Sequence, residues 1–138
     1  MADPRDPIVM IGGVPVVNAP QEIDAASAGS FRNIVLHAAS SGDAGVVVVN
    51  MTGTRFCDSS GVNALVCAHK QAVAEGGELL LVRPASAAVL RVFVINGLDR
   101  LIPHFANLNE GLEQAHAVVP RPLQRPATPS ADAGIPDL

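Results

Sequence analysis

Two short apolar segments, separated by one helix-length segment, constrain the fold of this chain most strongly. The first is the run of four valines at 46–49, and the second is Glu78–Val82, with sequence ELLLV. Because a strand buried on both faces carries an unbroken apolar run, both segments predict central strands of a parallel sheet. Residues 59–75 between them are long enough for a crossover helix, and Gly76 and Gly77 follow where helices commonly stop. This stretch therefore predicts a right-handed β-α-β unit.

The flanking segments extend this unit to the order β-β-α-β-α-β-α-β-α. Residues 8–11 and 14–18 predict a hairpin, in which Pro15 indicates a second strand that is irregular or at an edge. We expect a single α/β domain, with a mixed sheet of about four to five strands covered by about four helices. A first helix is expected from Asp24 to its end at Gly42 and Asp43, with Ala28, Phe31, Val35 and Ala38 on its inner side. A later helix is expected to be capped by Ser86 and to end at Asn96-Gly97, with Val89, Leu90 and Phe93 inside. An edge strand over 101–105, interrupted by Pro103, and a last helix over 109–118 complete the expected order.

Composition indicates one domain with an aliphatic core. Of the 138 residues, 49% are hydrophobic, yet the chain contains no Trp or Tyr. Residues 119–138 hold five of the 11 prolines and show no apolar periodicity, which is typical of a disordered tail. We therefore expect a flexible N-terminus over 1–5, a folded domain over 6–118 and a disordered, proline-rich tail over 119–138.

Charge and residue content argue against several classes of function. The net charge is −4 and the basic residues form no cluster, so we expect no nucleic-acid binding. No apolar run reaches the roughly 18–20 residues of a membrane helix, so we expect no membrane insertion. The segment MADPRDP lacks the apolar region of a signal peptide, which favours a cytoplasmic protein. The two cysteines, Cys57 and Cys67, lack the further ligands of a metal site, and we expect no cofactor.

The segment Asp58-Ser59-Ser60-Gly61 lies between a predicted strand and a predicted helix, and three interpretations of it remain open. Its polar side chains can cap the unpaired N–H groups of the first helical turn. Ser59 can also be a phosphate acceptor, because a phosphoryl group there would change the surface charge sharply beside Asp58. A serine nucleophile is the weakest interpretation, since the Gly-x-Ser-x-Gly pattern is absent, and we expect no enzyme. The candidate bases for such a nucleophile are His37, His69, His104 and His116.

Helical periodicity divides residues 59–75 into two sides. At about 100° per residue, one side is apolar and should face the sheet. The opposite side carries small, weakly polar residues, which permit close approach by another protein. The inner side comprises Val62, Leu65, Val66, His69 and Val73, and the outer side comprises Asn63, Ala64, Cys67, Gln71 and Ala74.

Four stretches in order resemble one known family. They are QEIDAASA at 21–28, the valine strand followed by TGTRFCDSSG at 46–61, GGELLLV at 76–82, and residues 89–105 with NGLD at 96–99. Together they resemble the STAS domain family and, within it, the bacterial anti-sigma factor antagonists. The resemblance covers about residues 8–117.

This resemblance implies a switch in transcription regulation. By analogy with the family, Ser59 would be phosphorylated by an anti-sigma factor that is also a serine kinase, and a phosphoserine phosphatase would reverse the modification. The unphosphorylated form would bind the anti-sigma factor and release the sigma factor, whereas phosphorylation would switch binding off. The residues expected to form or flank the partner-binding surface are Asp24, Asp58, Ser60, Gly61, Asn63, Ala64 and Cys67.

Two alternatives stay open at this point. STAS-like domains also serve as non-switching interaction modules, either as transporter subunits or as parts of sensory assemblies. Redox control through Cys57 and Cys67 is the other alternative, because a thiol near a helix N-terminus is expected to have a lowered pKa. The two cysteines are ten positions apart with a predicted helix between them, which argues against a bridge, because a bridge needs Cα atoms within about 7 Å.

Overall fold

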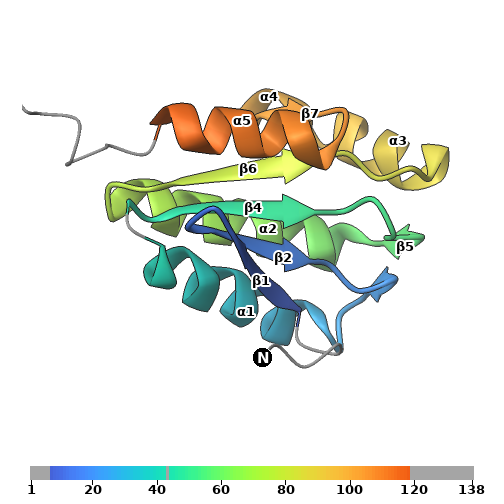
Figure 1. Cartoon of the computed structure of the whole chain (residues 1–138). Helices are drawn as coiled ribbons and strands as arrows, with labels where there is room; N and C mark the ends of the chain where they lie inside the picture. The colour runs from blue at the N-terminus through green and yellow to red at the C-terminus, as the bar shows by residue number, and fades with distance from the viewer. Residues whose placement is uncertain (1–6, 43, 119–138) are drawn as a thin grey trace, which may run out of the picture.

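The structure of the chain is a computed structural model that describes residues 7–42 and 44–118. Asp43, the expected N-terminal segment over 1–5 and the expected tail over 119–138 lie outside the described residues. The described part has the predicted α/β architecture, with a mixed sheet between helices (Figure 1).

Five strands form the main sheet in the order β1-β2-β4-β6-β7. The hairpin strands β1 and β2 pair antiparallel, with Ile8 opposite Val17, and every other neighbouring pair in this sheet is parallel. The parallel register places Val47 beside Leu79, which confirms the predicted β-α-β unit. The strands span Ile8–Ile11 (β1), Val14–Asn18 (β2), Val46–Asn50 (β4), Glu78–Val82 (β6) and His104–Phe105 (β7).

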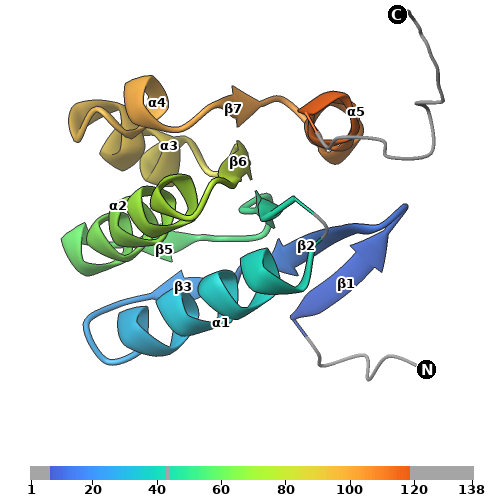
Figure 2. The same cartoon turned by 90° about the vertical axis from the view of Figure 1, so that its left-hand side faces the viewer.

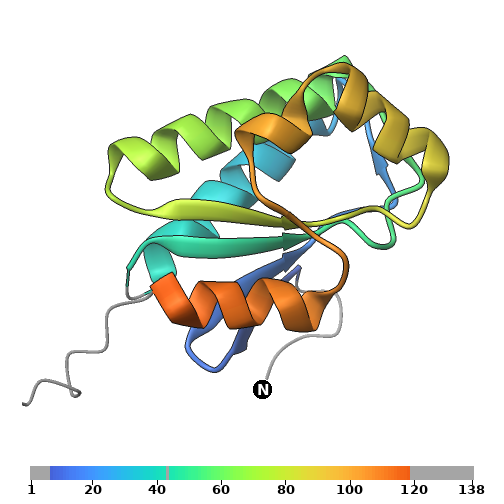
Figure 3. The same ribbon diagram turned by 90° about the horizontal axis from the view of Figure 1, so that it is seen from above.

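Helices cover both faces of the sheet. Seen along the strands, α1, α2 and α3 lie on one face, and α5 lies on the opposite face (Figure 2). The view from above shows the same layers, with the sheet between α2 and α5 (Figure 3). The helices span Ala28–Ser41 (α1), Ser59–Ala74 (α2), Ala87–Ile95 (α3), Leu98–Leu101 (α4) and Leu108–Val118 (α5).

The valine run shows how the central strands divide the core. In a strand, successive side chains point to opposite faces. Val47 and Val49 accordingly join the cluster under α1 and α2, whereas Val46 and Val48 join the cluster under α5. Because both faces are covered, all four valines are buried, and burial of each such side chain contributes about 1.5–3 kcal/mol.

Three details differ from the sequence-based expectations. Pro15 does not mark an edge, because β2 lies between β1 and β4, and its ladder to β4 begins one residue later at Val16. The expected strand over 101–105 is reduced to β7, because Gly97 adopts a positive φ of 73° and starts the short helix α4. β7 does lie at an edge of the sheet, as predicted. A second, two-stranded sheet of β3 and β5 was not predicted.

Candidate functional site at the start of helix α2

The second sheet carries the chain from the carboxyl edge of the main sheet to helix α2. Strand β3 spans Glu22–Ile23 and pairs in parallel with β5, which spans Phe56–Cys57. The N–H groups of Arg55 and Phe56 both donate to the carbonyl of Gln21, at 2.7 and 3.1 Å. Figure 1 shows β5 beyond the arrowhead of β4, directly before α2. The pair therefore fixes where α2 begins.

A buried hydroxyl holds the loop before β5 in place. Thr54 is fully buried, and its Oγ1 donates to the carbonyl of Pro20 at 2.9 Å. A buried hydroxyl that lost this partner would cost about 1–3 kcal/mol, so the contact favours a single loop position. Sequence reasoning missed Thr54, because the two residues are 34 positions apart and no local pattern links them.

Asp58 is the N-cap of α2, which agrees with the interpretation of this segment as a helix cap. Its Oδ1 accepts hydrogen bonds from the N–H groups of Ser60 at 2.9 Å and Gly61 at 3.3 Å. Its backbone is extended, with φ −96° and ψ −171°, as is usual for an N-cap. These two hydrogen bonds satisfy the N–H groups of Ser60 and Gly61, which the helix itself leaves without a carbonyl partner.

The two serines that follow differ in their surroundings. Ser59 is the first residue of α2, and its side chain is exposed. Its hydroxyl forms no hydrogen bond with any residue that the structure describes. Ser60 is half-buried and lines a depression together with residues of α1. Of the two hydroxyls, that of Ser59 is the more accessible to an approaching protein.

Gly61 allows α2 to pack tightly on the small sheet. A Cβ at this position would fall against Cys57 Sγ, and it would lie 2.9 Å from Cγ2 of Ile23. Gly61 is accordingly buried, so its contribution to the site is the close approach of the helix to β3 and β5.

The structure brings Asp24 and Asp58 to the same end of the small sheet. Ile23 and Cys57 are register partners, and each aspartate directly follows one of them. Asp24 does not cap α1 itself, which begins four residues later with Ser27 as N-cap. Its Oδ1 instead accepts from the N–H groups of Ala26 and Ser27, at 3.0 and 3.1 Å, and so caps the turn before the helix.

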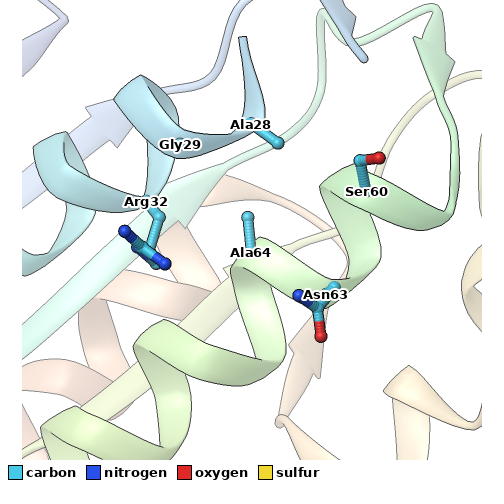
Figure 4. A pocket seen from close by; sticks show the side chains of 6 residues that line it. All are labelled: Ala28, Gly29, Arg32, Ser60, Asn63 and Ala64. Carbon is cyan, nitrogen blue, oxygen red and sulfur yellow. The ribbon is translucent and has the colours of Figure 1, made fainter. Parts of the chain in front are cut away.

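A shallow depression of about 160 Å³ lies between the first turns of α1 and α2 (Figure 4). Figure 4 shows the side chains of Arg32 from α1 and of Ser60 and Asn63 from α2 around it. Ala28, Gly29 and Ala64 complete its lining. Sequence reasoning missed Arg32, because only the packing of α1 on α2 brings it beside these residues.

The expected division of α2 into two sides is partly wrong. Asn63 and Gln71 are exposed as expected, but Ala64 is buried, and Val73, expected inside, is 51% exposed. The reason is that α2 packs against α1 as well as against the sheet. The buried stripe is therefore rotated toward the small residues Ala64, Ala68 and Ala72.

Cys57 does not have the properties that redox control would require. Both cysteines are free thiols, with Cys57 buried and Cys67 half-buried. Burial, and to a smaller extent the neighbouring Asp58 carboxylate, raises the pKa of the Cys57 thiol to about 11. The expected lowering of its pKa by the helix is thus wrong. A thiol that stays protonated at neutral pH is a poor nucleophile.

The candidate base His69 shares helix α2 with Ser59 but lies far from it. His69 lies on α2 ten residues after Ser59, or about 15 Å at the rise of an α-helix, too far to act as its base. Residues 7–42 and 44–118 contain no group of three or more His, Cys, Asp or Glu that could hold a metal ion.

Comparison with known families decides the classification. The model of the STAS domain matches residues 7–111, most of the chain. The chain belongs to the STAS domain family. The mixed sheet, the covering helices and the Asp-Ser-Ser-Gly turn described above are therefore those of a STAS domain, as the resemblance of the sequence implied.

Solved STAS structures share the fold at low sequence identity. An anti-sigma factor antagonist from Mycobacterium paratuberculosis has a TM-score of 0.69 and 23% identity, covering 79% of this chain and 91% of its own. The antagonist SpoIIAA in its unphosphorylated form has a TM-score of 0.66 and 24% identity, covering 82% of this chain and 97% of its own. The murine anion transporter Slc26a9 has a TM-score of 0.56 and 22% identity, covering 78% of this chain but 18% of its own.

A search among curated proteins finds no significant relative. None of the helices in the described part is both long and apolar enough to cross a membrane.

Proposed function

We propose that this STAS domain is an anti-sigma factor antagonist that is switched off by phosphorylation of Ser59. The observation that carries the proposal is the exposed Ser59 hydroxyl, which has no hydrogen-bond partner among the described residues and stands at the first position of α2. The likeness to anti-sigma factor antagonists supports the same assignment, and SpoIIAA has been solved in both unphosphorylated and phosphorylated forms. The partner would be an anti-sigma factor with serine kinase activity.

Local electrostatics explain how one phosphoryl group could act as a switch. A phosphoserine carries a charge of about −1.5 to −2 at neutral pH. The dipole of α2 favours a negative charge at the helix start, while the Asp58 carboxylate next to Ser59 repels one. The fold would therefore tolerate the group. A partner surface that fits the neutral hydroxyl would meet both added bulk and added charge, so binding would be lost.

Binding of the anti-sigma factor encoded in the same genome tests this proposal. We expect Ser59→Ala to bind as the wild type does and Ser59→Asp to bind at least tenfold more weakly, a loss of about 1.4 kcal/mol. Ser40→Asp is the matched control, because Ser40 is also an exposed serine but lies in the last turn of α1. Equal affinity of Ser59→Asp and wild type, measured by calorimetry, would contradict the proposal.

A non-switching interaction module is the second candidate function. The likeness to Slc26a9 favours it, because there a domain of this fold is part of a much longer transporter chain. For this candidate, the chain would bind its partner equally well with Ser59→Ala and Ser59→Asp, and no kinase would modify it. The same binding measurements therefore separate the two functions.

A further inference from the structure

The depression between α1 and α2 contains a positive charge that no described residue neutralises. Arg32 is exposed and lines the depression from α1. It forms no ion pair or hydrogen bond within residues 7–42 and 44–118. Ser60 and Asn63 line the same depression, and their side chains also have no hydrogen-bond partner in the described part of the chain.

The two aspartates that follow β3 and β5 are already engaged in hydrogen bonds. Asp24 accepts hydrogen bonds from Ala26 and Ser27, and Asp58 accepts them from Ser60 and Gly61. The guanidinium of Arg32, the hydroxyl of Ser60 and the amide of Asn63 can all donate. Three donor groups thus surround a space to which the described residues contribute no carboxylate.

The size of the depression indicates what it can hold. Pockets for small molecules and cofactors usually measure about 300–1,000 Å³, and this one measures about 160 Å³. It is therefore suited to the end of one side chain. Gly29 leaves its rim open, since a Cβ there would meet nothing within 4 Å. Ala28 and Ala64 contribute the apolar part of its lining.

We propose that this depression receives a carboxylate side chain of the anti-sigma factor, bound by the guanidinium of Arg32. Ser60 and Asn63 line the same depression and supply polar surface beside the carboxylate. The proposal rests on the proposed function, because it names how that partner is recognised. It also extends the docking surface from the start of α2 onto α1, beyond the residues that the sequence indicated.

The net charge of the chain limits what this contact can do. At −4, the molecule does not attract an acidic partner over long distances. Arg32 therefore contributes to specificity and to the lifetime of the complex, and little to the association rate. We expect substitution of Arg32 to raise the dissociation rate.

Affinity of the unphosphorylated full chain for the anti-sigma factor tests the proposal. We expect Arg32→Gln to weaken binding about 10- to 100-fold, as loss of a charge-assisted hydrogen bond does, and Arg32→Lys to lose less. Arg100→Gln is the matched control, because Arg100 is an exposed arginine on α4. Because Arg32 has no partner within the described residues, its variants should keep the melting temperature of the wild type.

A charge exchange identifies the carboxylate. Arg32→Glu should abolish binding, and replacing one acidic residue of the anti-sigma factor by Lys should restore it. If Arg32→Gln binds as tightly as Arg100→Gln while Ser59→Asp does not bind, the carboxylate contact is wrong and the proposed function stands. If the wild type itself does not bind the anti-sigma factor, both proposals are wrong.

Discussion

At the scale of single residues, close packing at Gly61 decides the geometry around Ser59. The absent side chain lets the first turn of α2 rest on Ile23 and Cys57, and this contact positions the residues before and after it. Phe56 points away from this packing and is 50% exposed, although it neighbours the buried Cys57. The alternation along β5 thus places one apolar side chain inside and another on the surface near Asp58.

We predict that Gly61→Ala destabilises the fold by about 1–3 kcal/mol, because the new methyl group overpacks a filled site. Gly29→Ala is the control, since that position on α1 is open, and it should leave stability unchanged or raise it by up to about 1 kcal/mol. Urea unfolding measures both. Adding Cys57→Ala to Gly61→Ala should recover part of the loss, and a Gly61→Ala protein as stable as the wild type would contradict the packing argument.

At the scale of elements, the start of α2 depends on its cap. Asp58 accepts two hydrogen bonds from the first turn, and it supplies the negative charge at this helix end, because α2 itself contains no acidic residue. The cap also anchors the helix to the small sheet, because the Asp58 N–H donates to the carbonyl of Ile23 at 3.3 Å. Ser59 therefore stands on a helix end whose position is fixed from both sides.

We predict that Asp58→Ala lowers the free energy of unfolding by about 1 kcal/mol, within the range of 0.5–2 kcal/mol for lost N-caps. Asp58→Asn should keep most of the stability, because an amide oxygen accepts the same two hydrogen bonds. Thermal or urea unfolding checks both variants. If Asp58→Asn costs as much as Asp58→Ala, Asp58 acts through its charge and not as a hydrogen-bond acceptor.

The sequence predicted the elements that are indicated by residues close together in the chain. The valine strand, the ELLLV strand, the crossover helix and its Asp58 cap all follow from apolar runs and capping residues within a few positions. What it could not predict depends on neighbours distant in the chain. The rotation of α2 toward Ala64, the anchor of Thr54 on Pro20 and the placement of Arg32 beside Ser60 arise only when α1 packs on α2 or when β3 pairs with β5.

At the scale of the whole molecule, the sheet and its two helical layers hold the small sheet and α2 as one unit. His69 is part of this packing, since it lies half-buried on α2 and its Nδ1 is buried without a partner. Desolvation lowers the pKa of His69 below 6.5, and the negative charge of Glu78 opposes this shift only in part. The folded state therefore disfavours the protonated imidazole.

We predict that this histidine makes the fold less stable in acid. Because the unfolded chain binds a proton at His69 more readily than the folded one, the free energy of unfolding should fall as the pH drops through 6.5 toward the lowered pKa. Urea unfolding between about pH 7.5 and pH 5 measures the slope. His69→Gln should reduce this slope. An unchanged slope in His69→Gln would contradict this assignment.

The central claim is that the Ser59 hydroxyl is the one that a kinase modifies. Its most direct measurement is tandem mass spectrometry of the wild type, Ser59→Ala and Ser60→Ala after incubation with the cognate anti-sigma kinase and ATP. We predict one phosphate on Ser59 in the wild type and in Ser60→Ala, and none in Ser59→Ala. Phosphate on Ser60 or at another position, with Ser59 unmodified, would contradict it.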